Sequence, residues 1–269
     1  MDKIGIIAGN GQFPRLIARA ARAEGMQVVA VALEGEADPA LEQEVDSLTW
    51  IRLGQLGKLI KTFKAAGVNQ LVMSGGVNKA RLFHNIRPDF KLITLLPRFK
   101  NMADDGLLRI LAQAMEEEGL IIRPSHILLP ALLAAPGLYT RRAPRPREQT
   151  DMDLGWEIFN SLGRLDIGQA LVLKNKVVVA VEAVEGTDAC ILRGGALVSS
   201  GTVVVKRCKI NQDERFDLPS VGTGTIAAMT QAGAVCLCIE AGRTLVFDKE
   251  EMIRAANERN ICIVARSPV

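Results

Sequence analysis

The chain has 269 residues, of which 48% are hydrophobic and only 4% aromatic. This length favours two domains of ordinary size, each able to bury a core of Val, Ile, Leu and Ala. A formal net charge of +3 argues against a nucleic-acid-binding protein, which carries a marked basic excess on one face. The sequence holds no apolar run long enough to span a membrane, and MDKIGIIAGNG at its start does not resemble a signal peptide.

Short apolar runs alternate with segments of helical periodicity in the first half. This alternation predicts parallel βαβ units and therefore an open, Rossmann-like sheet. In chain order we expect a strand at 3–9, a helix at 11–25, strands at 27–35 and 69–77 separated by a helix at 54–68, a strong helix at 104–120 and a weaker one at 124–134.

The alternation stops in the segment 135–150, which is rich in Pro and Arg and predicts a linker or hinge. It separates an amino-terminal domain, 1–134, from a distinct α/β domain, 151–269. In the second half we expect a helix at 152–166, a β-hairpin at 169–184 that turns at 174–176, a helix after 188, a strand at 202–208, a helix at 225–233, a strand at 234–242, a helix at 248–260 and a last strand at 261–267.

Five cysteines lie in the second half, at 190, 208, 236, 238 and 262. Cys236 and Cys238 alternate along an apolar strand, which favours small buried side chains over metal ligands. Their spacing with the two histidines matches no metal site, and free thiols fit a reducing, cytoplasmic compartment.

The first candidate site is Gly9-Asn10-Gly11, where a strand ends and a helix begins. Glycines at this position let the backbone approach a phosphate, and the helix amino end favours an anion. The spacing resembles a dinucleotide fingerprint, but Pro14 stands where its third glycine would be. An anion or nucleotide contact and an ordinary tight turn both remain open.

A second glycine turn, Gly75-Gly76, follows the strand at 69–77. Ligands of parallel sheets collect at the carboxyl ends of the strands, so both turns are expected at one edge. Lys79 could then neutralise a phosphate, or it could simply be a solvated lysine in an ordinary turn.

A third candidate is the sequence Glu185-Gly186-Thr187-Asp188, which follows the hairpin. Its carboxylates could take part in a metal site. Thr187 or Asp188 would also make a competent helix cap, which needs no catalytic role.

The fourth candidate runs from Lys206 to the loop that holds Gln212, Asp213, Arg215 and Asp217. Carboxylates about four residues apart can hold a hard divalent cation, and basic side chains can cover phosphates. A solvated charged loop is the alternative. A glycine turn that includes Gly222 and Thr225 then opens a helix and could bind a further phosphate oxygen.

The sequence supports few other catalytic chemistries. It has only two histidines, and it contains neither a Gly-x-Ser-x-Gly elbow nor a Walker-type loop. Carboxylates, a cation and a basic phosphate clamp are therefore the available chemistry.

Several of these segments together resemble one family. The segments IIAGNGQFP, SGGVNKARL, RPD, DDGLLR, EGTD, QDERFDLP, VGTGTI and IEAG are similar, in order and spacing, to the LpxI-type UDP-2,3-diacylglucosamine pyrophosphatases of lipid A synthesis. These are the pyrophosphatases built without a metallophosphoesterase fold, and the likeness runs from the first strand to nearly the last.

The resemblance implies hydrolysis of UDP-2,3-diacylglucosamine to 2,3-diacylglucosamine 1-phosphate and UMP, with attack of water on the phosphorus nearer the sugar. It also implies dependence on Mg²⁺ or another hard divalent cation, and a lipid held between a Rossmann-like domain and a carboxy-terminal domain. The nucleotide-activated glycolipid is the expected partner. Peripheral contact with the cytoplasmic face of the inner membrane and a homo-oligomer are left open.

Under this hypothesis Asp213 and Asp217 hold Mg²⁺ and activate water, without a decision on which is the key acid. Glu185 and Asp188 complete or orient the metal shell. Lys206, Arg215 and Lys79 face the phosphates, and the remaining binding contacts come from Gly9, Asn10, Gly11, Gly75, Gly76, Thr187, Gln212, Gly222 and Thr225.

Two other functions are compatible with the sequence. Gly224 leaves the VGTGTI turn without a carboxylate, and a family acid missing from that turn would favour a non-catalytic nucleotide-lipid sensor. The turn at Gly9 alternatively suggests a nucleotide-dependent oxidoreductase, against which the missing third glycine argues.

Overall fold

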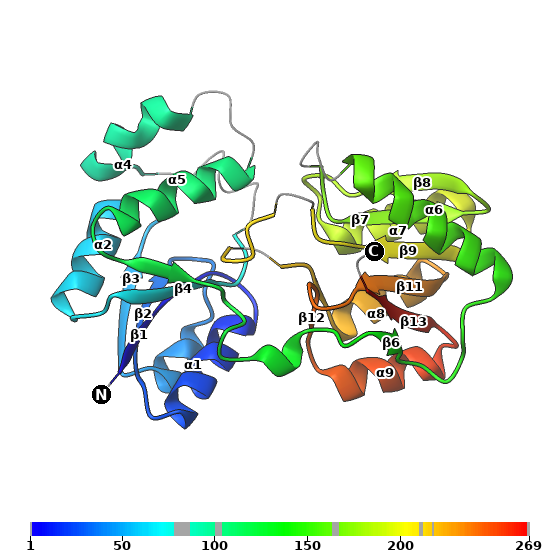
Figure 1. Cartoon of the computed structure of the whole chain (residues 1–269), viewed down its shortest axis with the longest axis horizontal. Coiled ribbons are helices and arrows are strands. Elements are labelled where there is room, and N and C mark those ends of the chain that lie inside the picture. The colour runs from blue at the N-terminus through cyan, green and yellow to red at the C-terminus, as the bar shows by residue number, and fades with distance from the viewer. Residues whose placement is uncertain are drawn as a thin grey trace. The chain divides into compact units, whose positions relative to one another are not determined.

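A computed structural model describes residues 2–77, 87–99, 104–162, 167–209, 212–216 and 218–267. The chain forms two compact units (Figure 1). Unit 1 comprises Met1–Pro130 together with Asp213–Asp217, and unit 2 comprises Ala131–Gln212 and Leu218–Val269. A short segment from the second half of the chain therefore belongs to the first unit.

Unit 1 is built on a parallel sheet, as the alternating pattern predicts. Its strand order is β3-β2-β1-β4-β5. The strands are nearly continuous apolar runs because helices cover both faces of such a sheet. They are β1 (Lys3–Ala8), β2 (Gln27–Leu33), β3 (Ser47–Ile51), β4 (Gln70–Ser74) and β5 (Ile121–Arg123).

The helices of unit 1 bury their apolar stripes on this sheet. One core cluster joins strand residues such as Val31 and Leu71 to Phe63, Leu92 and Met115 of three helices. The helical elements are α1 (Phe13–Ala23), α2 (Leu56–Ala65), α4 (Phe90–Leu95), α5 (Asp104–Glu116) and the 3₁₀ turns η1 (Pro39–Glu44) and η2 (Leu96–Phe99).

Unit 2 contains a mixed sheet in the order β6-β13-β11-β9-β7-β8. Strands β9, β11 and β13 are parallel, whereas β6 and β7 run antiparallel to their neighbours. The bounds are β6 (Gly137–Leu138), β7 (Ala170–Lys174), β8 (Val177–Val181), β9 (Thr202–Lys206), β11 (Ala234–Glu240) and β13 (Cys262–Arg266), with a separate parallel pair of β10 (Ser220–Val221) and β12 (Leu245–Val246).

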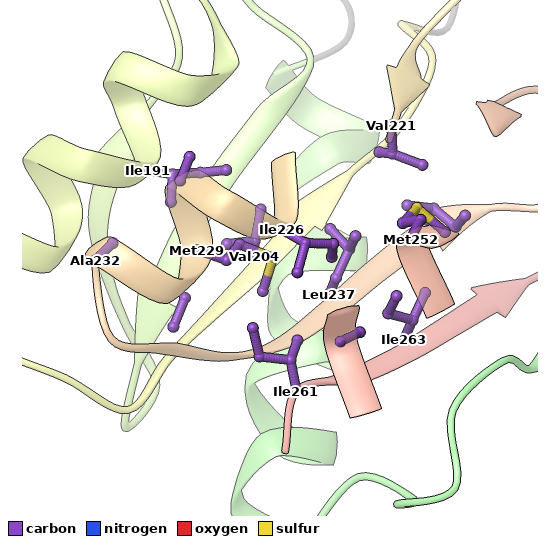
Figure 2. Packing of buried hydrophobic residues seen from close by; sticks show 14 of the residues in the cluster. Ile191, Val204, Val221, Ile226, Met229, Ala232, Leu237, Met252, Ile261 and Ile263 are labelled. Carbon is purple, nitrogen blue, oxygen red and sulfur yellow. The ribbon is translucent and has the colours of Figure 1, made fainter. Parts of the chain in front are cut away.

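Helices cover both faces of the unit 2 sheet. Helix α6 (Pro146–Leu162) packs Met152, Trp156 and Phe159 on one face, against Cys236, Cys238 and Cys262 among others. Figure 2 shows the cluster on the other face, where Ile191, Met229 and Met252 meet Val204, Leu237 and Ile263. Those three helical residues come from α7 (Thr187–Val198), α8 (Thr223–Gln231) and α9 (Lys249–Glu258).

The predicted hairpin is confirmed at its turn. Asn175 and Lys176 join β7 to β8 and have φ of 51° and 64°, as a two-residue type I′ turn requires. The buried carboxylate of Asp151 accepts hydrogen bonds from both of their backbone amides, at 2.9 and 2.6 Å. Helix α6 therefore fixes the hairpin by a charged side chain as well as by apolar packing.

The structure corrects the predicted boundaries at the middle of the chain. The helix expected at 124–134 is wrong, because the segment holds only the 3₁₀ turn η3 (Pro130–Leu132). Pro130 lacks an amide hydrogen and clashes with the preceding turn, so a helix cannot pass through it. Helix α6 begins at Pro146 rather than at 152, and the segment expected as a linker, 135–150, contains β6 and the first turn of α6. None of the helices in the described part of the chain is long and apolar enough to cross a membrane.

Candidate functional site

The strand order of unit 1 reverses between β1 and β4. From β1 the chain proceeds to β2 on one side, and β4 joins β1 on the other side. The loops that leave the two strands diverge at such a point and open a crevice at their carboxyl ends. Gly9 follows β1 and Gly75 follows β4, so both glycine turns lie at this switch point.

The two glycine turns are hydrogen-bonded to each other. The amide of Gly9 donates to the carbonyl of Ser74, and the amide of Asn10 donates to that of Gly76, both at 2.8 Å. In return the amide of Gly76 donates to the Asn10 side-chain Oδ1 at 3.2 Å. The expected meeting of Gly9, Asn10, Gly75 and Gly76 at one sheet edge is confirmed, and their contact with a substrate stays a prediction.

Close backbone packing explains two of these glycines. A Cβ atom on Gly9 would lie 2.2 Å from the Gly76 carbonyl oxygen, and one on Gly75, at φ +80°, would lie 2.3 Å from that of Asn10. Gly11 differs, because its φ of +86° requires glycine while no described atom lies within 4 Å of its Cβ position. The Gly11 backbone is thus open to an approaching group, two residues before α1 begins at Phe13.

Two polar side chains complete the switch point. The Ser74 hydroxyl is buried and has no hydrogen-bond partner among the described residues. The Asn10 amide donates to the Glu36 carboxylate at 3.2 Å. Because buried hydroxyls are normally satisfied, Ser74 is a candidate ligand contact that the sequence pattern did not single out.

The segment 213–216 lies on unit 1, where Phe216 packs against the core. Arg215 forms a bidentate ion pair with the Asp213 carboxylate, in which Nε lies 3.0 Å from Oδ1 and Nη2 lies 2.8 Å from Oδ2. Its Nη1 donates to Glu116 of α5 at 2.7 Å. The hydrogen bonds from Arg215 lower the pKa of Asp213, so this carboxylate is ionised at neutral pH.

The corresponding edge of unit 2 gathers buried charged residues. Strands β8, β9, β11 and β13 all point the same way, so Glu182, Lys206, Glu240 and Arg266 lie at or just beyond their carboxyl ends. Glu182, Lys206 and Glu240 are only 9%, 6% and 1% exposed. Charged side chains are seldom this buried unless they are paired or functional.

Hydrogen bonds hold these charges in place. The Lys206 ammonium donates to the Ser220 carbonyl at 2.7 Å. The Glu240 carboxylate accepts from the Cys208 amide at 2.9 Å and lies 3.5 Å from Arg207, whose guanidinium stacks 4.0 Å from the centre of the Trp156 ring. Lys206, a predicted catalytic residue, therefore lies with Glu240 at an edge where parallel sheets bind ligands.

Two hydrogen bonds stabilise the segment between β9 and α8, and they involve Gln212, Gly222 and Thr225. The Gln212 side chain accepts from the Lys209 amide at 2.9 Å. The hydroxyl of Thr225 accepts from the Gly222 amide at 3.4 Å, at the start of α8. These bonds give the three residues a structural role in unit 2, and their substrate contacts remain untested.

Helix α7 begins at Thr187, at the same edge of unit 2. Glu185 lies just before the helix, and Asp188 lies in its first turn. The Thr187 hydroxyl donates to Glu182 at 3.1 Å. Glu185 pairs with Arg193 at 2.5 Å, and the hydrogen bond from that guanidinium lowers its pKa. Asp188 is exposed in the first turn of the helix, as a capping acid would be.

The predicted metal ligands come from both units. Asp213 belongs to unit 1, Glu185 and Asp188 belong to unit 2, and Asp217 and the predicted phosphate contact Lys79 lie outside the described residues. Within the described ranges no three His, Cys, Asp or Glu side chains form a metal cluster. Magnesium sites with only one or two protein carboxylates, completed by substrate phosphates and water, are common, so metal binding by Asp213 stays a prediction.

The described features define a class of protein. It is a two-unit α/β protein with a Rossmann-type sheet in unit 1, a mixed sheet in unit 2, and polar residues at the ligand-binding edge of each sheet. Many proteins with different functions share these features, so the family has to be identified by comparison with known proteins.

Family models cover nearly the whole chain. Residues 3–132 match the LpxI N-terminal domain, and residues 135–264 match the LpxI C-terminal domain. The chain belongs to the LpxI family. It is 32% identical over 280 residues to the UDP-2,3-diacylglucosamine pyrophosphatase LpxI of Caulobacter vibrioides, covering 100% of this chain and 99% of the relative. The expected family is thus confirmed, and with it the expectation of an enzyme.

The likenesses to two solved structures are distant. Thermotoga maritima N5-carboxyaminoimidazole ribonucleotide synthetase is 14% identical with a TM-score of 0.29, covering 68% of this chain and 41% of the other. Leucoanthocyanidin reductase of Vitis vinifera, in its NADPH complex, is 16% identical with a TM-score of 0.30, covering 55% and 41%. Scores this low support no statement about ligand or mechanism.

Proposed function

We propose that this protein hydrolyses the pyrophosphate bond of UDP-2,3-diacylglucosamine, in two domains divided near residues 135–150. The products would be 2,3-diacylglucosamine 1-phosphate and UMP, and the reaction would take place on the cytoplasmic side of the membrane. The observation that carries the proposal is the full-length match, at 32% identity, to a pyrophosphatase of that name.

The polar edges of the two sheets support this chemistry. A pyrophosphate diester is anionic and kinetically inert, so its hydrolysis requires neutralisation of the phosphate oxygens and a positioned water. Lys206 supplies a positive charge, and the open backbone at Gly11 suits a phosphate at a helix amino end. The charge of Arg215, predicted to face the phosphates, is instead paired with Asp213 and Glu116. Asp213, held ionised by Arg215, is suited to bind a cation, whereas its lowered pKa makes it a weak proton acceptor.

Mg²⁺ is part of the proposal and would be held by Asp213, together with Asp217 and phosphate oxygens of the substrate. When bound it supplies Lewis-acid stabilisation of charge on the phosphates. Glu185 and Asp188 are assigned to the outer shell. Arg215 positions Asp213, so the carboxylate does not have to be ordered during each turnover.

The proposal is tested by incubating purified protein with UDP-2,3-diacylglucosamine, with and without Mg²⁺, and identifying the products by mass spectrometry. We expect UMP and the lipid monophosphate only when the cation is present. Reaction in ¹⁸O-labelled water should place the label on the lipid phosphate. Binding of the substrate with no release of UMP would instead identify a sensor, and a nicotinamide absorbance change would identify an oxidoreductase.

A further inference from the structure

Helix α4 of unit 1 and Leu96, the first residue of η2, present an apolar stripe to solvent. Phe90, Ile93 and Leu96, spaced three residues apart, are 81%, 47% and 49% exposed. Leu92 and Leu95, on the opposite side, are buried in the core. The helix is therefore apolar on both sides, although only one side is needed for folding.

The stripe is held in a fixed position by Asp89. One carboxylate oxygen accepts from the Leu92 amide of α4 at 3.0 Å, and the other accepts from the Gly57 amide of α2 at 2.6 Å. A Cβ atom on Gly57 would lie 3.3 Å from the Cβ of Lys91, so the two helices pack closely. Figure 1 shows α4 at the margin of unit 1, beyond α5.

A basic hollow of about 450 Å³ lies beside the stripe, between α2 and α4. Ile60 and Ala65 contribute to its apolar lining, and Lys61, Lys64, Lys91 and Glu118 provide its charges. Hydrogen bonds from Lys91 and Lys64, at 2.7 and 2.9 Å, lower the pKa of Glu118 to about 2. Three lysines thus face one carboxylate, and the hollow is net positive.

We propose that the α4 stripe (Phe90, Ile93 and Leu96) and the adjoining lysines form a docking surface for an anionic phospholipid bilayer. The apolar side chains would enter the interface and the lysines would face lipid phosphates, which is the pattern of peripheral membrane binding. A second copy of the chain is a poorer occupant, because a two-fold contact across the hollow would bring two net positive surfaces together. The surface lies within unit 1, and its binding does not depend on the proposed reaction.

The test is sedimentation of the full-length protein with vesicles of phosphatidylcholine alone, or mixed with phosphatidylglycerol. Wild-type protein should bind only the mixed vesicles, and added salt should weaken the binding. Lys61→Glu should bind about fivefold more weakly or worse, and the double variant Phe90→Ser, Ile93→Ser should lose most binding. The matched controls in unit 2 are Lys176→Glu, and Val177→Ser with Leu197→Ser, whose side chains are 61% and 65% exposed.

Several outcomes would overturn the proposal. They are an absence of vesicle binding, equal binding to both vesicle types, or α4 variants that bind like the unit 2 controls. Circular dichroism checks that each variant is folded. Sedimentation velocity measures whether the wild type forms a dimer in solution. A dimer that the α4 variants abolish, without binding of the wild type to vesicles, would show that the stripe mediates self-association instead. Activity on detergent-dispersed substrate should be unchanged in the α4 variants, which separates this proposal from the proposed reaction.

Discussion

Arg215 holds the carboxylate of Asp213 through two side-chain nitrogens, at 3.0 and 2.8 Å, and through its own backbone amide at 3.1 Å. The same guanidinium reaches Glu116 of α5 at 2.7 Å. One arginine thus fixes an acid of the 213–216 segment and attaches that segment to a helix of unit 1. Arg215 therefore both fixes the position of the Asp213 carboxylate and keeps it ionised.

Asp213→Asn should reduce UMP release about a hundredfold or more while the protein stays folded. The amide keeps the shape of the side chain but carries no charge and is a much weaker ligand for a cation. The measurement is kcat under saturating substrate and Mg²⁺. Glu214→Gln is the matched control in the same segment and should retain near-normal turnover. If both variants are equally active, Asp213 has no role in the reaction.

The Asp213–Arg215 pair predicts a pH dependence of stability. Arg215 lowers the pKa of Asp213 below its ordinary value of 3.8. A carboxyl whose pKa is lower in the folded state stabilises the fold above its unfolded pKa, and loses this effect as the pH falls through the folded value. The free energies of unfolding of wild type and Asp213→Asn should therefore differ by a constant amount near neutral pH and converge below about pH 4. A difference that grows on acidification would contradict this cause.

Gly75→Ala should destabilise unit 1 by about 1–3 kcal/mol or more. The new Cβ would meet the Asn10 carbonyl 2.3 Å away, and the φ of +80° is strained for any other residue. Gly224→Ala is the control, because its Cβ position has no described atom within 4 Å and lies in helix α8. The control should keep or slightly raise the melting temperature. Equal melting temperatures for the two variants would contradict close packing of the glycine turns.

Asp89→Ala should cost about 1–2 kcal/mol for each helix amino terminus that it caps. The side chain serves both α4 and α2, through the amides of Leu92 and Gly57. Asp89→Asn keeps one acceptor oxygen and should lose less. Denaturant titration measures both free energies of unfolding. A loss no larger in Ala than in Asn would show that the second hydrogen bond contributes nothing.

Strand and helix alternation predicted a parallel sheet in unit 1 and three of its strands, β1, β2 and β4, and the sequence also predicted the hairpin of unit 2. The edge strands β3 (Ser47–Ile51) and β5 (Ile121–Arg123) were not predicted. Elements too short to show a period, such as β6 (Gly137–Leu138), could not be predicted this way. The helix expected at 124–134 does not form, because Pro130 interrupts a segment whose apolar spacing is otherwise helical. The placement of 213–216 on unit 1 also gave no local signal, since a charged loop has the same composition whichever unit it packs on.

The candidate site likewise contains some residues that the sequence predicted and others that it did not. The glycine turns were predictable, because a glycine after a buried strand marks a βα turn in which the backbone comes close to another group. Glu240 was not selected, although a carboxylate ending the apolar run AVCLCI was visible in the sequence. The hydroxyl of Ser74, which has no hydrogen-bond partner in the described part of the chain, could not have been predicted, since burial and hydrogen bonding depend on the tertiary fold.

The five cysteines should not react with a thiol reagent in the native state. All five are free and buried, which confirms the buried position predicted for Cys236 and Cys238. Burial raises the pKa of Cys190 to about 11 and that of Cys238 to about 12. Because all five thiols are buried and a bulky reagent cannot reach them, modification by an aromatic disulfide reagent near neutral pH should require unfolding. Its rate should follow the rate of unfolding and rise on addition of denaturant. Rapid labelling of even one cysteine without denaturant would show that its local structure opens far more readily than its packing indicates.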